Sequence, residues 1–456
     1  MIRFIDRGYE LSLLNEEWEK NEAQFVIVYG RRRIGKTTLI SEFIKDKPGI
    51  FYIADDVNKK VQINDFKEKI ASFFDDNLLK NIVFEEWKDL FEYLKKILPK
   101  NKRLHITIDE FSYFIKNDPA LASVLQKFWD TFLKKTRIFL LVSGSIFGLM
   151  SEKILSASSP LYGRRTRDIL LKQLTLKDAC EFTKIDFEEK LKIYMGIGGV
   201  PEYLLKAKDF SNSKEFFKKE FVSKDGYFYR EPYYLLSQEF KEIKTYFTIL
   251  NAIAYGNTKP SEIANFVGIK TREIYPYLEN LLRLDFIEKL TPITRSKKTG
   301  VYLIKDVFFD CWFNLVFNNR EDIERGQLKF NEKEINTYFD KQFETISRND
   351  FIPKIFTKSK VGKWWHRDKE IDIVAINEKE KQIVFFECKW KTLGYQKCLK
   401  ILEELQEKAE YVEWLDGKCK KQYGVIAKKI DDKSVLRKKG YLVYDLDDWK
   451  STLQIH

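Results

Sequence analysis

Short continuous apolar runs and segments with helical spacing alternate in the first part of the chain. The runs FVIVY (25–29), LHITI (104–108) and IFLLV (138–142) are typical of strands buried on both faces of a parallel sheet. Helical periodicity begins directly after the first run and its glycine-rich loop, from residue 36. The pattern predicts an α/β fold in which strand, loop and helix follow one another.

A second pattern lies at residues 258–290, where apolar residues recur at helical spacing. We expect Ser261 to cap one helix and Thr271 to cap the next, with Gly268 in the turn between them. Pro276 is tolerated only near the start of a helix, which suggests that the second helix begins later than Thr271. Two strand-like runs, FIEKL and VYLI, follow, so the segment has the pattern of a winged helix.

The last part of the chain begins after GQLKF, which resembles a linker. YFDKQFETISRNDFI is predicted to be a helix, and KWWHRDKEIDIVAI and IVFFECKW are predicted to be two strands joined by a turn. Glu387 and Lys389 stand two residues apart on the second strand, so they share a face next to the apolar core. Burying an acid and a base there is costly unless they have a function or form an ion pair.

The composition fits a folded chain of 456 residues with 44% hydrophobic and 15% aromatic content, a length typical of about three domains. The N-terminus lacks a signal-peptide pattern, and the longest apolar run, IFLLVSGSIFGLM, is too short to cross a bilayer. Five cysteines without a CxxC pair argue against a zinc site or a disulfide framework. We therefore expect a cytoplasmic protein without a membrane partner.

The net charge bears on the choice of partner. It is +12 at pH 7, with 81 basic against 69 acidic residues, which favours a polyanion such as DNA or another nucleic acid. A lysine-rich surface that is merely hydrated explains the same number. Charge alone leaves both interpretations open.

The loop after the first strand carries G-x-x-x-x-G-K-T from Gly30 to Thr37. In such a loop, backbone N–H groups surround the phosphates of ATP at the start of a helix, Lys36 reaches the β- and γ-phosphates, and Thr37 holds Mg²⁺. The alternative is a plain glycine-rich turn. The predicted nucleotide-binding residues are Gly30, Arg31, Arg32, Arg33, Ile34, Gly35, Lys36, Thr37 and Thr38.

The second strand-like run ends in Asp109 and Glu110, the two predicted catalytic residues of ATP hydrolysis. Asp109 would hold Mg²⁺ through water, and Glu110 would orient the attacking water. The third run ends in Ser143 and Ser145. A polar residue at that strand end contacts the γ-phosphate or simply ends the strand, and we assign Ser145 to the nucleotide.

Arginines at 164, 165 and 167 are candidates for an arginine finger, within the chain or towards a neighbouring copy in a homo-oligomer. A solvated basic loop is the alternative for each. GRRRIGKT, ITIDEF, LVSGS, PLYGRRT and MGIGGVPEYL together resemble the archaeal-type P-loop ATPases of the signal-transduction branch related to AAA proteins, known as STAND ATPases. The resemblance implies that Arg164 or Arg165 belongs to the nucleotide-sensing segment, and that Gly198 and Gly199 shape a turn of the lid. It also implies a doubly wound ATPase core that acts as an ATP-dependent switch.

A winged helix would place the start of its second helix in the major groove of DNA. We expect Lys270 and Arg272 to lie there, and Arg295, Lys297 and Lys298 to contact phosphates from the wing. A helical subdomain that packs on the ATPase without touching DNA is the alternative.

Glu344 on a helix, Asp372 on a strand, and Glu387 and Lys389 on the next strand resemble the PD-(D/E)XK nuclease superfamily. Asp372 and Glu387 can hold one Mg²⁺, Glu344 adds a ligand or orients water, and Lys389 polarises the attacking water. Ile371 stands where that superfamily has proline. A structural ion pair between Glu387 and Lys389 is the alternative for the motif, and the fold is also compatible with weak or no cleavage.

The sequence predicts an α/β multidomain protein with a doubly wound P-loop ATPase core at residues 1–170, a helical lid at 171–245 and a winged helix at 246–310. A restriction-endonuclease-like α/β domain is expected at 326–456. The predicted function is an ATP-hydrolysing switch, with ATP and Mg²⁺ as cofactors, coupled to DNA binding and to phosphodiester cleavage. The competing hypothesis is a signalling or DNA-binding ATPase whose nuclease-like domain serves for docking.

Overall fold

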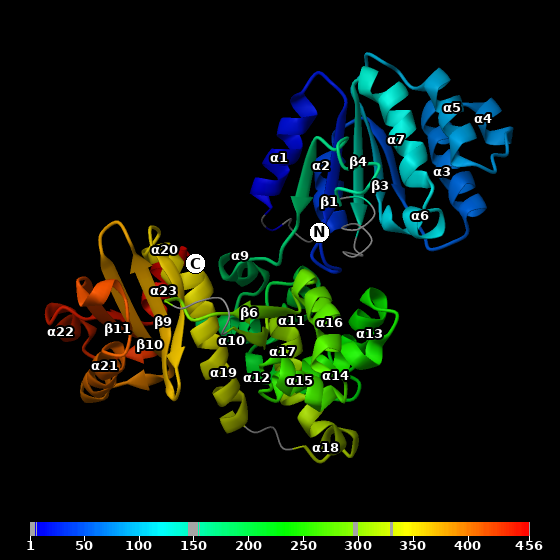
Figure 1. The fold of residues 1–456 in the computed structure, drawn as a ribbon. Coiled ribbons are helices and arrows are strands. Elements are labelled where there is room, and N and C mark those ends of the chain that lie inside the picture. The colour runs from blue at the N-terminus through cyan, green and yellow to red at the C-terminus, as the bar shows by residue number, and fades with distance from the viewer. Residues whose placement is uncertain are drawn as a thin grey trace. The chain divides into compact units, whose positions relative to one another are not determined.

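The computed structural model describes residues 5, 7–144, 154, 156–294, 300–328 and 332–455. The chain divides into two compact units, Met1–Gln173 and Leu174–His456, whose elements are labelled in Figure 1. Each unit has its own sheet and its own buried core.

The first unit is built on a five-stranded parallel sheet in the order β2-β3-β4-β1-β5. The strands are β1 Gln24–Tyr29, β2 Gly49–Ile53, β3 Leu104–Asp109, β4 Ile138–Gly144 and β5 Arg167–Leu170. The helices are α1 Gly8–Glu19, α2 Lys36–Ile44, α3 Lys59–Phe74, α4 Asn77–Asn81, α5 Trp87–Ile97, α6 Ser112–Asn117 and α7 Leu121–Thr131.

Separate apolar clusters cover the two faces of this sheet. Phe25 and Ile27 of β1 pack with residues of α3, α5, α6 and α7, whereas Val26 and Val28 pack with α1 and α2 (Figure 1). Strands covered on both faces need apolar side chains at every position, which explains the continuous runs. The predicted strands at 25–29, 104–108 and 138–142 and the doubly wound arrangement are confirmed.

His105 of β3 is buried, and its Nδ1 lies 3.0 Å from the hydroxyl of Thr107. Burial lowers the pKa of His105 to about 4. The neutral ring is therefore stabilising above the unfolded pKa of about 6.5, and this stability is lost as the pH falls towards 4. We expect the first unit to lose about 2 kcal/mol between pH 7 and pH 5 through this residue. Chemical unfolding of wild type and His105→Gln at both pH values tests this: equal pH dependence in the two proteins would contradict it.

The second unit begins with helices and ends with a mixed sheet. Its first helices are α9 Leu176–Ala179, α10 Phe187–Ile197, α11 Pro201–Ala207, α12 Ser213–Glu220, α13 Glu231–Glu239, α14 Ile243–Ala254, α15 Pro260–Val267 and α16 Thr271–Arg283. The antiparallel pair β6 Ile287–Leu290 and β7 Val301–Ile304 follows, then α17 Val307–Leu315 and α18 Arg320–Glu324.

The last part contains a five-stranded sheet in the order β12-β11-β10-β9-β8. Its strands are β8 Lys360–His366, β9 Lys369–Asn377, β10 Gln382–Leu393, β11 Lys420–Ile430 and β12 Leu442–Tyr444. The helices are α19 Glu332–Ile346, α20 Ile352–Ile355, α21 Tyr395–Ala409, α22 Lys433–Lys438 and α23 Leu446–Leu453. Strands β8, β9 and β10 are antiparallel, whereas β10, β11 and β12 are parallel.

Helix α19 joins this sheet to the helices before it. The Tyr338 hydroxyl donates to the carbonyl oxygen of Met195 on α10 at 2.8 Å, and Gln342 Nε2 donates to Asp310 Oδ2 on α17 at 2.6 Å. Lys341 adds an ion pair of 3.1 Å to the same buried carboxylate. The contacts of Tyr338 and Gln342 are closed to water, whereas Lys341 is exposed, so the two buried contacts fix α19 to α10 and α17.

The turn between α10 and α11 requires glycine. Gly198 has φ 64° and ψ −158°, a conformation that is essentially open to glycine alone. A Cβ atom on Gly199 would lie 1.9 Å from the carbonyl oxygen of Leu174. The two glycines therefore let the chain pass directly against the start of the second unit.

Candidate functional site

The P-loop lies between β1 and α2. Gly30, Arg33 and Gly35 have positive φ, and a Cβ on Gly30 would meet the carbonyl oxygen of Leu171 at 2.5 Å. These glycines let the backbone turn at the start of α2, where its N–H groups point towards a bound anion. Lys36 is almost fully buried, and its Nζ donates to the carbonyl oxygens of Gly30 at 3.2 Å and Arg31 at 2.9 Å.

Strand β4 lies between β1 and β3, so its end faces both motifs. The Thr37 hydroxyl donates to Asp109 Oδ2 at 2.5 Å, and the Ser143 hydroxyl donates to Asp109 Oδ1. The backbone N–H of Glu110 also donates to Oδ1, at 3.0 Å, and Glu110 has φ 53°. The structure thus brings Thr37, Asp109, Glu110 and Ser143 together at the carboxyl edge of the sheet.

Ser143, the first of the two serines that end the third run, lies against Asp109. Its hydroxyl contacts Asp109, and its carbonyl oxygen accepts a hydrogen bond of 2.7 Å from the N–H of Phe111. Ser145 lies outside the described residues. The end of β4 is hard to predict from the sequence, because the serines follow the apolar run directly and the first of them belongs to the strand.

The other predicted nucleotide residues lie in or next to the loop. Arg32 Nη2 donates to the Tyr113 hydroxyl at 2.7 Å, Ile34 is buried, and Thr38 is exposed on α2. A hydroxyl and a carboxylate in contact, as at Thr37 and Asp109, are hard oxygen donors of the kind that Mg²⁺ prefers. The residues present therefore fit a nucleotide with its Mg²⁺.

Arginines 164 and 165 lie just before β5. Strand β5 runs parallel to β1 with Val26 opposite Arg167, so residues just before β5 lie at the amino edge of the sheet, whereas the P-loop follows the carboxyl edge. Arg164 pairs with Asp130 and Arg165 with Asp168, each at 3.0 Å. Contact of either arginine with a nucleotide, within the chain or in a neighbouring copy, stays a prediction.

The C-terminal motif forms a buried charged cluster. Lys389 Nζ lies 3.2 Å from Glu387 Oε2 and 3.9 Å from Asp372 Oδ2, and both carboxylates are buried. Burial raises the pKa of Asp372, and the carboxylates of Glu387 and Glu344 raise it further. Burial opposes the charge on Lys389, but Asp372 and Glu387 outweigh it and raise its pKa.

Glu344 has different partners from those expected. Its oxygens accept from Arg348 Nη1 at 2.9 Å and from Lys363 Nζ at 3.0 Å. It acts on Asp372 through its charge rather than through a shared contact. Among the described residues, no group of three or more His, Cys, Asp or Glu side chains is arranged to hold a metal ion.

The strands separate at this cluster. The pairing of β9 with β10 ends at Ile373 and Phe386, and beyond it the N–H of Cys388 donates to Asp372 Oδ2 at 2.8 Å. The N–H of Trp390 donates to Asp340 Oδ1 of α19 at 2.5 Å. Asp372 therefore completes the backbone hydrogen bonds of β10 in addition to any chemical role.

Sequence reasoning missed Asp340, Arg348, Lys363 and Lys408. Lys408 Nζ of α21 lies 2.7 Å from Glu387 Oε1. Asp340 and Glu344 are four residues apart and so share a helix face, a spacing that the sequence displays. The lysines carry no local signal, because only the fold brings them to the carboxylates.

The predicted helices and strands of the segment after α13 are present as α15, α16, β6 and β7, and two details of the prediction are wrong. Helix α16 begins at Thr271 and contains Pro276, so the expectation of a later start is wrong. The caps differ too: Glu262 accepts from the N–H of Lys259 at 3.1 Å, and Glu273 accepts from that of Lys270 at 3.4 Å. These glutamates, rather than Ser261 and Thr271, satisfy the first N–H groups.

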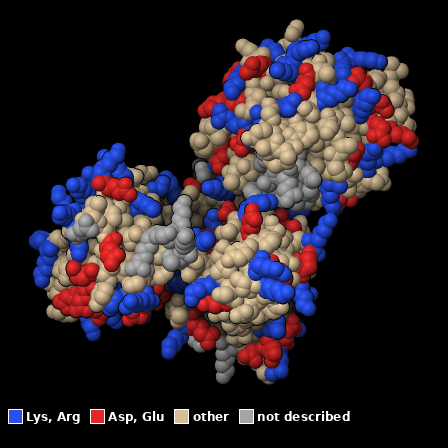
Figure 2. Space-filling view, in the orientation of Figure 1, with Lys and Arg blue, Asp and Glu red and all other residues tan. Residues whose placement is uncertain are grey.

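The predicted DNA contacts are placed in part. Lys270 and Arg272 lie exposed at the start of α16, and the Arg272 side chain is 80% exposed. Arg295, Lys297 and Lys298 lie outside the described residues. Figure 2 shows basic and acidic side chains interspersed on the visible face, so net charge alone does not mark a DNA surface.

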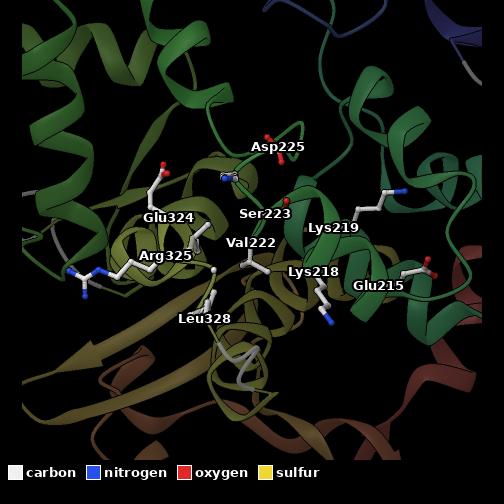
Figure 3. A pocket seen from close by; sticks show the side chains of 12 residues that line it. Glu215, Lys218, Lys219, Val222, Ser223, Asp225, Glu324, Arg325 and Leu328 are labelled. Carbon is white, nitrogen blue, oxygen red and sulfur yellow. The ribbon is translucent and has the colours of Figure 1, made fainter.

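An open pocket of about 600 Å³ lies on the second unit beside α12 and α18 (Figure 3). Its rim carries charges of both signs, including Lys218, Lys219, Glu215, Glu324 and Arg325. None of these residues belongs to the two motif clusters. Separately, no helix within the described residues is long and apolar enough to cross a membrane.

The comparisons with known proteins agree with a nucleotide site at the P-loop. A family described as "ATPase domain predominantly from Archaea" matches residues 4–207. A protein of Methanocaldococcus jannaschii, "Uncharacterized protein MJECL04", is 36% identical over 98% of this chain and 100% of its own length. The chain belongs to the archaeal ATPase family.

Further matches cover parts of this archaeal ATPase. A second protein of that organism, "Uncharacterized ATP-binding protein MJ0423", is 45% identical over 10% of this chain and 80% of its own. The Walker-type ATPase PABY2304 of Pyrococcus abyssi shares the fold, with a TM-score of 0.53 and 20% identity over 68% of this chain and 96% of that one. A family described as "Archaea bacterial proteins of unknown function" matches residues 312–401. The archaeal ATPase therefore binds and hydrolyses ATP.

Proposed function

We propose that this ATPase is a nucleotide-controlled switch that binds DNA and cleaves phosphodiester bonds with Mg²⁺ in its C-terminal domain, residues 326–456. The observation that carries the proposal is the cluster of two buried carboxylates, Asp372 and Glu387, with the half-buried Lys389 where β9 and β10 separate. Two buried carboxylates on neighbouring strands are destabilising by themselves and gain from a bound cation.

The order of elements supports this assignment. A helix (α19), three antiparallel strands (β8, β9, β10), a helix (α21) and a parallel strand (β11) follow one another. This arrangement is the one expected of a restriction-endonuclease-like core. The acidic residues lie on α19, β9 and β10, in the order that the sequence predicted.

In this site Asp372 and Glu387 would hold Mg²⁺, and Glu344 would orient a water from α19. The ion would lower the pKa of a bound water and neutralise the scissile phosphate. Lys389, held at 3.2 Å from Glu387, would orient the attacking water and stabilise the charge that develops on phosphorus. The raised pKa of Lys389 keeps its ammonium group charged at neutral pH.

In the ATPase unit, Lys36 would leave the loop carbonyls for the phosphates, and Thr37 and Asp109 would hold the second Mg²⁺. Glu110 would orient the hydrolytic water. We further assign α14 to α16 with β6 and β7 to a winged helix that contacts DNA through Lys270 and Arg272. Phosphate contacts of this kind make the affinity fall steeply with salt, so absence of DNA binding at low salt would remove this assignment.

The test is a nuclease assay with Mg²⁺ or Mn²⁺, with and without ATP, on single-stranded and duplex DNA. We expect Lys389→Ala to slow cleavage by about 100-fold or more, because one positioned cationic donor is lost at the reacting phosphate. Lys391→Ala, an exposed lysine two residues further along the same strand, should cleave like wild type.

The same assay tests a second candidate function. If wild type leaves every substrate intact with ATP and either metal, the C-terminal domain serves for docking in an ATP-dependent signalling protein. That outcome is favoured by the close ion pairs of Glu387 and Glu344, which satisfy both carboxylates without a metal. Lys36→Ala would then alter DNA binding or assembly, whereas Lys389→Ala would alter neither.

A further inference from the structure

Lys408 is placed to act on the C-terminal site although no motif includes it. It lies in the last turn of α21, and its Nζ lies 2.7 Å from Glu387 Oε1, while Lys389 Nζ lies 3.2 Å from Oε2. The two ammonium groups thus occupy both oxygens of a carboxylate that is 7% exposed. A cation held by Glu387 must replace or share at least one of them.

The two lysines are not equivalent. Lys389 also lies 3.9 Å from Asp372, so it has a second carboxylate within the cluster. Lys408 forms its ion pair with Glu387, and the Lys408 side chain is 31% exposed. A dication repels a nearby ammonium, and both lysines have similar access to water, with side chains 37% exposed at Lys389 and 31% at Lys408. Lys389 is also attracted by Asp372, so Lys408 is the group that gives way.

The backbone of Lys408 cannot follow such a movement. Leu405 and Ala409 are fully buried against Ile371, Val374 and other residues of the sheet. Only the four-carbon side chain of Lys408 can swing, over a range of a few ångströms around the cluster. It therefore stays beside the site after it leaves Glu387.

We propose that Lys408 is a second active-site lysine, which blocks Glu387 in the metal-free protein and binds a phosphate of the nucleic-acid backbone once a divalent cation has displaced it. This inference rests on the proposed nuclease function. The displaced ammonium needs a new anion, and the backbone phosphate at the cleavage site is the anion that such a cluster would receive. Loading of the metal and capture of the substrate are then linked through one side chain.

The first measurement is Mn²⁺ binding by calorimetry, without nucleic acid, on the full chain. Lys408→Met removes the competing ammonium and keeps the apolar stem, so we expect Mn²⁺ affinity to rise about fivefold, as for loss of a partly exposed ion pair. Lys400→Met, an exposed lysine two turns earlier on α21, is the matched control and should bind like wild type. Unchanged or weaker Mn²⁺ binding by Lys408→Met overturns the proposal.

The second measurement is the KM for DNA cleavage. Lys408→Met should raise KM about tenfold through the lost phosphate contact, and Lys408→Arg should restore it, because guanidinium also binds phosphate. A rise in Mn²⁺ affinity without a change in KM would overturn the substrate contact. Failure of the nuclease function itself is distinguishable, because wild type would then show no Mn²⁺ binding that depends on Asp372.

Discussion

Replacement of Lys36 by alanine is expected to reduce ATP hydrolysis by about 100-fold or more. This ammonium is the cation of the P-loop, and loss of one preorganised donor at a transferring phosphoryl group has an effect of that size. In the structure it donates to the carbonyl oxygens of Gly30 and Arg31, so it lies within the loop that surrounds the phosphates. Phosphate release and binding of a fluorescent ATP analogue measure the two steps separately.

The control for this prediction is Lys45→Ala. Lys45 is exposed at the C-terminal end of the same helix and should leave hydrolysis unchanged. Circular dichroism and thermal unfolding establish that both variants fold. Hydrolysis by Lys36→Ala within threefold of wild type would mean that the loop does not hold the triphosphate as proposed.

Asp372→Asn should abolish both Mn²⁺ binding at the C-terminal cluster and DNA cleavage, with a loss in rate of about 100-fold or more. The amide oxygen can still accept the N–H of Cys388, so the hydrogen bond of 2.8 Å is retained in the variant. Burial and the nearby Glu387 and Glu344 raise the pKa of Asp372, so its ionised form is disfavoured in the folded protein at neutral pH. Removing that charge should leave stability unchanged or raise it.

Glu370→Gln provides the comparison for Asp372→Asn. Glu370 lies two residues earlier on β9, its side chain is 60% exposed, and it pairs with Lys363 at 3.2 Å. The same chemical change at an exposed position should leave Mn²⁺ affinity and cleavage near the wild-type values. A cleavage rate of Asp372→Asn equal to that of Glu370→Gln would exclude Asp372 as a ligand.

The Walker elements could be predicted because each is local: an apolar strand, a glycine loop and a helix in sequence order. The contact between Thr37 and Asp109 needed only that parallel strands end at one edge. The contact of Ser143 with Asp109, and the position of Arg164 at the opposite edge of the sheet, depended on where β4 ends and on the direction of β5. Those are properties of the topology, which no short motif records.

The C-terminal site was predicted only in part for the same reason, since topology brings some of its residues together. Spacing on one strand placed Glu387 and Lys389 on a common face, whereas Lys363 and Lys408 reach the acids from other elements. The prediction that Ser261 and Thr271 cap the two helices was wrong for a different reason. Glutamates at the third helical position satisfied the first N–H groups, so the hydroxyl residues favoured by propensity were not needed.

Helix α19 gives the C-terminal acids a mechanical link to the helices after the ATPase core. Tyr338 and Gln342 hold it to α10 and α17, and Glu344 stands half a turn beyond Gln342 on the same stiff rod. Helix α19 also contacts β10 through Asp340 and β8 through the ion pair of Glu344 with Lys363, so a tilt of α10 and α17 would act on the Glu344 carboxylate and on these sheet contacts together. The position of α19 therefore sets where the Glu344 carboxylate lies relative to Asp372 and Glu387.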